Sequence, residues 1–524
     1  MSAPQATSGP SGARPATAAA PQPGRRQWLI LAVVGIAQLM IVLDITVVNI
    51  ALPSAQRSLH FSAVDRQWVI TAYALAFGSL LLLGGRLADL LGRKVTFMTG
   101  LVGFAAASAA GGAAGSFGML VTARACQGAF AAVMAPAALS ILTVTFSDPK
   151  DRGKAFGVFG AIVGTGGAVG LLLGGALTEY LSWRWTLYVN LLFAALALAG
   201  AAALLRRSPA GPRPRLDVPG VVSVSGAMFC LVYGFANAAT HGWRAPSTWG
   251  FLVVGVVLLA AFAAWQARAA EPLLPPRVVL DRNRGGAYLA MLIAGAGMFG
   301  IFLFLTYYLQ NTLGYSPVVT GLAFLPMVGA LMASAITGQI VLMPRVGPRP
   351  LIGLGLLLAA AGMAWLTRLG VHSGYASAVL GPLLVTAAGL GLVFAPSENT
   401  GTFGMAPSDA GVASATINVG QQLGGSIGTA LLNTMAASAT AGYLTAHLGP
   451  ATLVRGRPGP ALVQQSAVHG YTVGFWWAAG IFAAGAVICG VLLRSGPLAR
   501  QPAPSQEDPV TEVVRADLQP VRQA

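Results

Sequence analysis

The run Leu43-Asp44-Ile45-Thr46-Val47-Val48-Asn49-Ile50-Ala51-Leu52-Pro53 places a carboxylate inside the first long apolar segment of the chain. An ionisable group within a membrane is costly unless it is paired or functional. The chain has the composition of a membrane protein, because 55% of its 524 residues are hydrophobic and only 9% are charged, too few charges to cover a soluble fold of this size. Asp44 is the first candidate for a working residue, and Asn49 is a second polar candidate.

Apolar segments of membrane-spanning length divide the chain. A helix needs about 20 residues to cross a bilayer, and we predict fourteen segments of this kind. They lie at residues 28–50, 67–88, 95–113, 119–142, 153–175, 185–205, 217–237, 248–266, 285–310, 320–341, 350–368, 377–398, 411–435 and 471–494. The sequence therefore predicts an all-α integral membrane protein.

Pro- and Arg-rich linkers at 208–219 and 271–284 border two of these segments, which hold no acid or base inside the membrane. We therefore expect a two-helix insert between two six-helix halves. The predicted organisation is a disordered tail (1–27), an N-terminal half (28–205), linkers with the insert (206–284), a C-terminal half (285–494) that includes a long external loop (436–470), and a second tail (495–524).

The basic residues predict the orientation. When alternate loops are assigned to one side, 23 of the 31 Lys and Arg residues fall on the side of both termini. Basic loops remain in the cytoplasm, so we expect both termini there and the protein in a bacterial cell membrane. This asymmetry accounts for the net charge of +16, and no basic stretch interleaved with aromatics points to a nucleic-acid partner.

A second ionisable group lies in the fourth predicted segment. Arg124 and Gln127 are three residues apart and so share one helix face. A guanidinium buried in lipid needs an acceptor or a carboxylate, and Asp44 is the natural partner. The alternative is that Arg124 snorkels to the membrane surface.

The loop after the second segment reads Gly85-Arg86-Leu87-Ala88-Asp89-Leu90-Leu91-Gly92-Arg93-Lys94. Its glycines permit a tight turn, and Asp89 can accept charge-assisted hydrogen bonds. Together with the Asp44 run, this sequence closely resembles the loop between helices 2 and 3 of the major facilitator superfamily. In that superfamily the loop acts as a latch between conformations. The resemblance implies that fold and a latch at Gly85, Asp89, Gly92 and Arg93; the alternative is that the charges only anchor the loop at the lipid headgroups.

The fourth segment also resembles the superfamily's fourth-helix motif, whose arginine is tied to proton transfer. The resemblance implies that Asp44 and Arg124 couple proton movement to transport.

The fifth segment is rich in glycine, and Gly164, Gly170, Gly174 and Gly175 lay a groove of small residues along it. The spacing resembles the superfamily's antiporter signature, except that Leu171 stands where that signature has a proline. The alternative is that the glycines only allow tight packing.

Further motifs resemble the fourteen-helix drug:proton antiporter branch: Trp183-Arg184-Trp185 before the sixth helix, Gly314-Tyr315-Ser316-Pro317, and residues 411–428. On this resemblance the candidates for contact with substrate in the cavity are Asn49, Gln127, Asn190, Tyr307, Tyr308, Gln310, Asn418 and Gln422. The alternatives are an interfacial belt for the tyrosines and hydrogen bonds between helices for the amides.

The predicted function is efflux of amphiphilic drugs or antibiotics by proton antiport and alternating access. The expected partners are protons, the lipid bilayer and a small amphiphilic molecule, and we expect the chain to work as a monomer. A neutral or monocationic substrate is favoured, because Glu398 near a helix end is the acid found in the helices of the second half. No phosphate-binding loop and no metal-ligand spacing occur, so we expect no cofactor, no metal and no enzyme site.

Two other functions remain open. A metabolite importer or exporter of the same superfamily would use the same helices. A non-transporting membrane scaffold or sensor would need a folded soluble domain or a long interaction tail, and residues 495–524 are too short for a domain.

Overall fold

The computed structural model describes residues 24–62, 65–146, 149–206, 217–269, 272–274, 276–405, 410–447 and 459–496. Within these ranges every regular element is a helix. The predicted tails fall almost entirely outside the ranges, and the linker predicted between the N-terminal half and the insert falls largely outside them.

The first half of the chain forms long helices joined by short connections. They are α1 (Arg25–Leu59), α2 (Gln67–Leu91), α3 (Arg93–Gly112), α4 (Phe117–Thr145), α5 (Pro149–Ala176) with the π-helical turn η1 (Leu177–Leu181), and α6 (Trp185–Leu204). The insert follows as α7 (Val218–His241) and α8 (Pro246–Gln266).

The second half repeats this pattern with more π-helical turns. It contains α9 (Pro276–Val279), α10 (Arg282–Tyr307), η2 (Tyr308–Thr312), α11 (Pro317–Thr337), η3 (Gly338–Leu342), α12 (Met343–Val346), α13 (Pro348–Leu366), η4 (Tyr375–Val379), α14 (Leu380–Thr402), α15 (Ala410–Ala446) and α17 (Pro460–Leu492).

Each predicted segment falls on one of these long helices. In the described part of the chain, 11 helices are long and apolar enough to cross a membrane. The remaining predicted segments fall on α2, α5 and α15. The count of fourteen crossings and the cytoplasmic position of the termini stay predictions.

The predicted external loop at 436–470 is wrong over much of its length. α15 continues to Ala446, and α17 begins at Pro460. The sequence between 436 and 446 is rich in alanine, the strongest helix former, and proline is well suited to the first turn of a helix. The two extensions pack together, since a Cβ on Gly470 would meet Thr440. The length of the apolar runs therefore predicted helices at 411–435 and 471–494 but did not predict their helical extensions into the 436–470 region.

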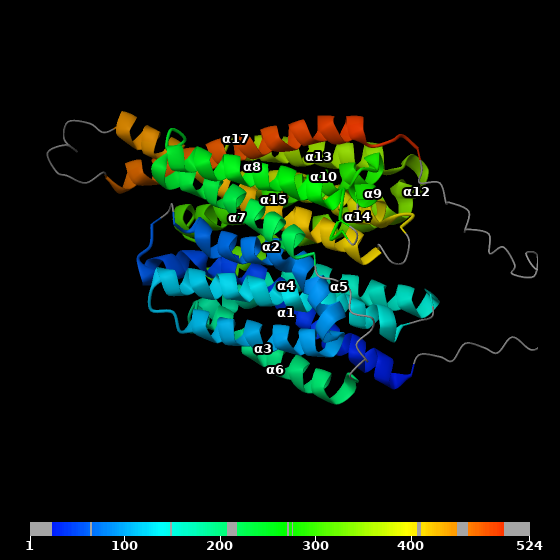
Figure 1. The fold of residues 1–524 in the computed structure, drawn as a ribbon. Coiled ribbons are helices and arrows are strands. Elements are labelled where there is room, and N and C mark those ends of the chain that lie inside the picture. The colour runs from blue at the N-terminus through cyan, green and yellow to red at the C-terminus, as the bar shows by residue number, and fades with distance from the viewer. Residues whose placement is uncertain are drawn as a thin grey trace, which may run out of the picture.

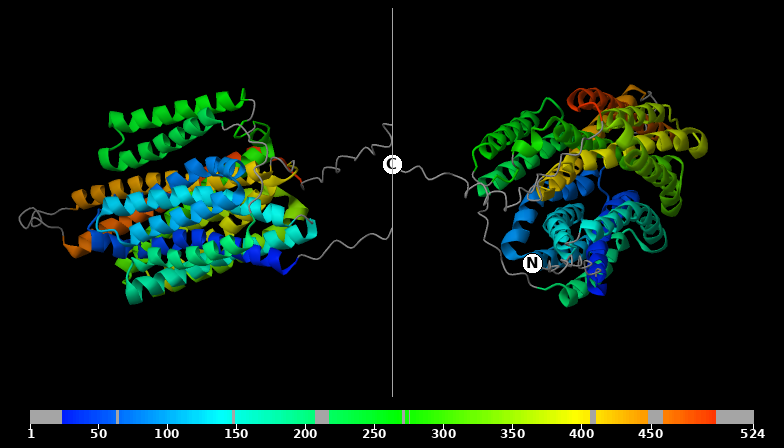
Figure 2. Two further views of the ribbon diagram at one scale, coloured as in Figure 1. Left: turned by 60° about the horizontal axis from the view of Figure 1, so that its bottom comes forward. Right: turned by 90° about the vertical axis from the view of Figure 1, so that its right-hand side faces the viewer.

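The helices form two bundles that lie side by side, one from each half of the chain (Figures 1 and 2). In the first, α4 packs against α2 and α3, and α1 packs against α5 and α6. In the second, α10 packs against α15, and α13 packs against α14 and α17. We call the end of the molecule where α1 begins and α17 ends the terminal end, and the other the far end.

The insert lies along one flank of the molecule, as the left view of Figure 2 shows. α7 contacts α2 of the first bundle and α15 of the second. The insert therefore rests on both halves.

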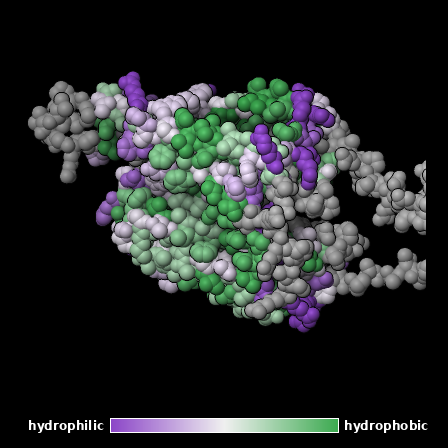
Figure 3. Space-filling view, in the orientation of Figure 1, coloured by the Kyte–Doolittle hydropathy of each residue, from purple (hydrophilic) through white to green (hydrophobic). Residues whose placement is uncertain are grey.

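The surface shows where lipid is expected. Apolar side chains gather over the middle of the helices, and hydrophilic residues gather towards both ends (Figure 3). Many large apolar residues are exposed, among them Val222, Val257 and Val487. Apolar exposure on this scale is typical of a membrane interface.

Candidate functional site

Asp44 lies in the core of the first bundle, 1% exposed, and four side-chain hydrogen bonds organise its surroundings. Its Oδ2 forms an ion pair with Arg124 Nη1 of α4 at 2.5 Å. Its Oδ1 accepts hydrogen bonds from Gln127 Nε2 at 3.0 Å and from Asn190 Nδ2 of α6 at 2.8 Å. Arg124 Nη1 also donates to Gln127 Oε1 at 2.9 Å. The carboxylate thus joins α1 to α4 and α6.

A residue that the sequence did not single out completes this network. Ser108 of α3 is fully buried, and its Oγ accepts from Gln127 Nε2 at 2.7 Å and from Asn190 Nδ2 at 3.4 Å. The sequence feature that could have identified Ser108 is its hydroxyl group within an otherwise alanine- and glycine-rich run. That signal is weak, because serine in a membrane helix commonly bonds to its own backbone.

Arg124 has further contacts that fix its guanidinium. Its Nε donates to the carbonyl oxygen of Val69 at 3.1 Å, and its guanidinium carbon lies 4.5 Å from the ring centroid of Tyr73. Both residues belong to α2. A buried guanidinium is tolerated when charge, hydrogen bonds and a ring face replace water.

Close backbone approach explains how α4 reaches these groups. A Cβ on Gly128 would lie 2.2 Å from the carbonyl oxygen of Tyr73, so only glycine fits there. One turn earlier on α4 is Arg124, within reach of Val69. Gly128 thus sets the distance between α2 and α4 that the arginine bridges.

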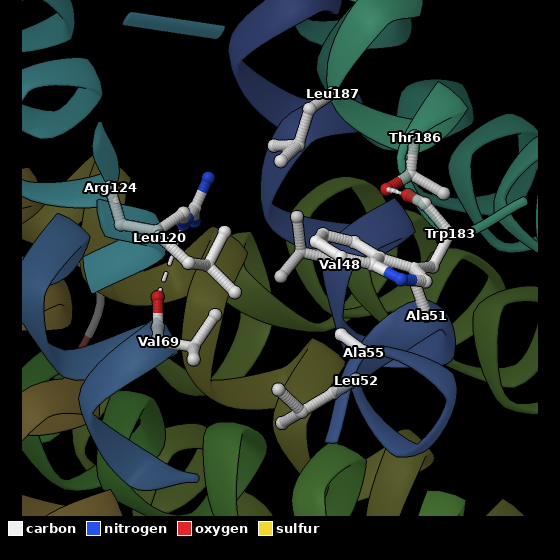
Figure 4. Close-up of a pocket in the computed structure, with 10 residues that line it drawn as sticks. All are labelled: Val48, Ala51, Leu52, Ala55, Val69, Leu120, Arg124, Trp183, Thr186 and Leu187. Carbon is white, nitrogen blue, oxygen red and sulfur yellow. Dashed lines mark hydrogen bonds between the residues drawn. The ribbon is translucent and has the colours of Figure 1, made fainter. Parts of the chain in front are cut away.

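A small pocket adjoins Arg124 on its far-end side. Its cavity volume is about 10 Å³, roughly the space of one water molecule, and Figure 4 shows apolar side chains of α1, α2, α4 and α6 around it. Trp183, just before α6, and Leu187 of α6 face Val48 and Leu52 of α1 across the space. The ion pair therefore lies beside closely spaced apolar side chains of the bundle.

Three of the four predicted packing glycines contact other helices. A Cβ on Gly170 would meet Thr46 Oγ1 at 1.9 Å, and one on Gly174 would meet Val47 Cα at 2.9 Å. A Cβ on Gly175 would meet Val318 Cα of α11 at 2.8 Å. The surroundings of Gly164 lie outside the part that the structure describes. The glycine groove of α5 thus faces α1 and, at its far end, the second bundle.

The halves meet at the far end. Tyr307 donates to Gln56 Oε1 at 2.5 Å, and Gln310 Nε2 donates to the carbonyl oxygen of Ile50 at 3.0 Å. The amide of Val318 donates to Glu179 at 2.9 Å. Leu171, at the position of the signature proline, places its carbonyl against Gly321 of α11, where a Cβ would lie 2.5 Å away. The structure is closed at this end.

The other substrate candidates are spread out. Asn49 is buried in α1 and donates to its own helix at Ile45. Gln422 is buried where α15 meets Gly78 of α2.

Tyr308 donates to the carbonyl oxygen of Gly370 within the second half at 2.8 Å. Asn418 is exposed on α15 and donates to Ser414. The structure gathers only Gln127 and Asn190 of the eight candidates around Asp44.

The predicted latch is a one-residue connection between α2 and α3. Gly92 has φ +88°, a conformation that favours glycine, and Arg93 begins α3. A Cβ on Gly85 would touch Pro136 of α4 at 3.8 Å. The side chain of Asp89 lies outside the described residues.

Two cations of the same stretch make the contacts that the sequence did not assign. Lys94 Nζ donates to the last carbonyl groups of α6, at Ala202 and Leu205. Arg86 donates to the carbonyl oxygen of Pro272, after the insert, at 3.2 Å. The stretch therefore ties the start of α3 to α6 and the end of α2 to the insert's second linker.

Comparison with known protein families identifies the family of the chain. Residues 34–429 match the family model described as Major Facilitator Superfamily. The chain belongs to the major facilitator superfamily. It is thus a transporter of this superfamily and a multi-pass protein of the cell membrane, as the apolar helices indicate.

Curated relatives resemble the chain over most of its length. The puromycin resistance protein pur8 of Streptomyces alboniger is 50% identical over 91% of this chain and 94% of its own. The cephamycin export protein CmcT of Amycolatopsis lactamdurans is 40% identical over 79% of this chain and 87% of its own. The tetracenomycin C resistance and export protein of Streptomyces glaucescens is 35% identical over 85% and 82%.

Solved structures share the fold at low identity. An inward-facing bacterial homologue of the human lysosomal transporter Spinster superposes with a TM-score of 0.61 at 17% identity, covering 89% of this chain and 97% of that chain. The POT family transporter PepTSo superposes with a TM-score of 0.63 at 15% identity, covering 90% and 98%. The predicted superfamily fold is confirmed.

Proposed function

We propose that the protein exports amphiphilic drugs or antibiotics from the cell and that proton antiport at Asp44 drives the export. Relatives that match most of the chain are resistance and export proteins. The observation that carries the coupling proposal is the buried ion pair between Asp44 and Arg124. Such a pair inside a membrane domain is costly to maintain and is a functional site by default.

The geometry supports a mechanism in which one proton changes the contacts between helices. The ionised carboxylate accepts from Arg124, Gln127 and Asn190 and so binds α1 to α4 and α6. A proton on Asp44 removes the negative charge and one acceptor site, so this set of contacts must rearrange. Breaking a buried pair costs about 3–5 kcal/mol, enough to change the balance between two conformations.

α1 carries the change to the contact between the halves. Asp44 lies six residues from Ile50, whose carbonyl accepts from Gln310, and twelve residues from Gln56, which accepts from Tyr307. A shift of α1 therefore acts on the closed far end. Opening there and closure at the terminal end would expose the space between the halves to the outside.

The substrate is proposed to bind between the halves as a neutral or singly charged amphiphile. In the described residues of α10, α11, α14 and α15, Glu398 is the only carboxylate, and it lies exposed four residues before the end of α14. A dication would need a second buried carboxylate. The chain works as a monomer in this scheme, since each half supplies one wall of the route.

The test is uncoupler-sensitive efflux of a fluorescent monocationic dye from cells that express the protein. Wild type is compared with Asp44→Asn at matched membrane abundance, and with Asp151→Asn as a control that alters a carboxylate paired at the surface with Lys154. Wild type and the control should extrude dye until uncoupler is added, and Asp44→Asn should not. Equal efflux by Asp44→Asn would remove Asp44 from the coupling mechanism.

A further inference from the structure

Arg66 is a buried cation at the far end that the proposed transport mechanism does not use. It is 6% exposed and lies between the two halves. Its Nε donates to Asn433 Oδ1 of α15 at 3.3 Å, and its guanidinium carbon lies 4.1 Å from the ring centroid of Tyr307 and 6.0 Å from that of Tyr471. Arg66 therefore comes from the first half and is held by the second.

The charge of Arg66 has no counter-charge in the described part of the chain. No carboxylate there lies within 4.0 Å of its nitrogens, in contrast to Arg124 and its partner Asp44. The neighbouring amide nitrogen of Asn433 is buried and also has no acceptor among the described residues. Buried charges and buried donors are stable when an acceptor satisfies them. The surroundings of Arg66 and Asn433 therefore lack a negatively charged acceptor.

A hollow lies beside Arg66. Its volume is about 450 Å³, and its walls come from α1, the connection between α1 and α2, α10, η2 and α17. Arg57, His60 and Arg66 line it together with the polar side chains of Gln56 and Asn311, and its lining contains no acidic residue. Arg57 and His60 are exposed, so the hollow is open to ions from the far side.

We propose that this hollow binds a small anion, either a free halide such as chloride or a carboxylate group, against the guanidinium of Arg66. The observations that carry the proposal are the buried guanidinium without a carboxylate partner and the lining of the space next to it, which holds Arg57, His60 and Arg66 and no Asp or Glu. Guanidinium donors and a neighbouring positive charge are the usual ligands of such anions.

The location gives the anion a role in conformation. The residues that line the site belong to both halves, since Arg57 and Arg66 come from the first and Tyr307 and Tyr471 from the second. A ligand that binds only when the halves meet stabilises that state in proportion to its occupancy. Anion binding would therefore favour the conformation that is closed at the far end, whichever substrate the protein carries.

The test uses the purified protein in detergent without added lipid and needs no transport. The melting temperature is measured in sodium methanesulfonate, a poorly coordinating anion that carries no carboxylate, while sodium chloride or sodium acetate replaces it at constant sodium concentration. We expect a saturable rise of a few degrees with at least one of the two small anions. A rise with chloride alone identifies an inorganic anion, and a rise with acetate identifies a carboxylate as ligand.

Variants locate the effect. Arg66→Gln should abolish the rise, and Arg345→Gln, which alters an exposed arginine at the terminal end, should leave it unchanged. If Arg66→Gln does not fold, the double variant Arg57→Gln and His60→Gln, at exposed positions, should weaken the rise. Identical melting in all three salts, or a full rise in both Arg66→Gln and the double variant, would overturn the proposal.

Discussion

Asp44 accepts from donors that differ in kind. Arg124 supplies charge, whereas Gln127 and Asn190 supply amide N–H groups that are themselves fixed by Ser108. Asn190 Oδ1 is buried and has no donor among the described residues. A protonated Asp44 has a hydroxyl to donate, and this amide oxygen is an acceptor next to it. The same side chains can therefore serve the charged and the neutral carboxyl group.

The role of Ser108 can be tested by Ser108→Ala. This substitution removes an acceptor from two buried amides, and an unsatisfied buried donor costs about 1–3 kcal/mol. We expect dye efflux to fall several-fold at unchanged abundance, because Gln127 and Asn190 lose their fixed orientation. The matched control is Ser79→Ala, whose hydroxyl donates to its own helix at Leu75. Efflux equal to that of the control would show that Ser108 only fills space.

At the scale of the helix, α5 is built to lie against α1. A Cβ at Gly170 or Gly174 would overlap with Thr46 or Val47, within the turn that follows Asp44 on α1. The groove of α5 therefore holds the part of α1 that carries the carboxylate. Without a hydrophobic drive in lipid, such close contact of small residues supplies the attraction between helices.

Gly174→Val should for this reason impair the protein more than a substitution at Gly167, which lies on the same helix but faces open space. The added side chain would meet backbone of α1 at 2.9 Å, so α1 and Asp44 must move. Gly167→Ala is the matched control, since a Cβ there meets nothing within 4 Å. We expect the first variant to lower melting temperature and efflux, and the control to change neither. A reversed order would contradict the packing described for α5.

The insert has its own polar anchor at Asp217, just before α7. Its carboxylate accepts from the amide of Gly220, from Trp265 Nε1 and from Gln266 Nε2 at 3.0, 2.7 and 2.6 Å. Burial alone would raise the pKa of Asp217, but the hydrogen bonds from Gln266 and Trp265 and from backbone amides hold this pKa below its usual value. The carboxylate thus joins the start of α7 to the end of α8.

A lowered pKa in the folded state means that the anchor stabilises at neutral pH and loses its effect as the pH falls through the acidic range. Asp217→Ala should cost about 1 kcal/mol, the usual contribution of a helix N-cap. Melting of the purified variant against wild type should show a gap in stability that persists from neutral pH down to about pH 4 and narrows below it. A gap that widens on acidification would exclude an ionised anchor.

At the scale of the whole molecule, the orientation in the membrane is a prediction from basic loops alone. In a background without Cys126, Cys230 and Cys489, Arg57→Cys at the far end and Arg345→Cys at the terminal end would carry exposed thiols. A membrane-impermeant maleimide should label Arg57→Cys on intact cells and Arg345→Cys only after permeabilisation. The opposite pattern would place both termini outside.

Sequence patterns predicted the helices and the division into halves because crossing a bilayer requires long apolar runs. They also paired Asp44 with Arg124, since a charge in lipid needs a partner. They did not find Ser108 or Arg66, because these residues depend on groups from helices distant in the sequence, and neither forms a motif. The dispersal of Tyr308 and Asn418 has the same cause: a polar residue in a membrane helix does not reveal which neighbour it faces.

The insert has a consequence for how the two bundles can move. α7 touches α2 through the rings of Trp68 and Tyr233 and a hydrogen bond from Ser225 to the carbonyl oxygen of Ser79, and it touches α15 near Thr434 and Phe235. When the two bundles rotate in opposite directions, α7 cannot move with both of them. Its contact with either α2 or α15 must therefore slide in every transport cycle. Contacts through ring faces and single hydroxyl groups can slide at little cost, whereas an ion pair at the same place would oppose the movement of the bundles.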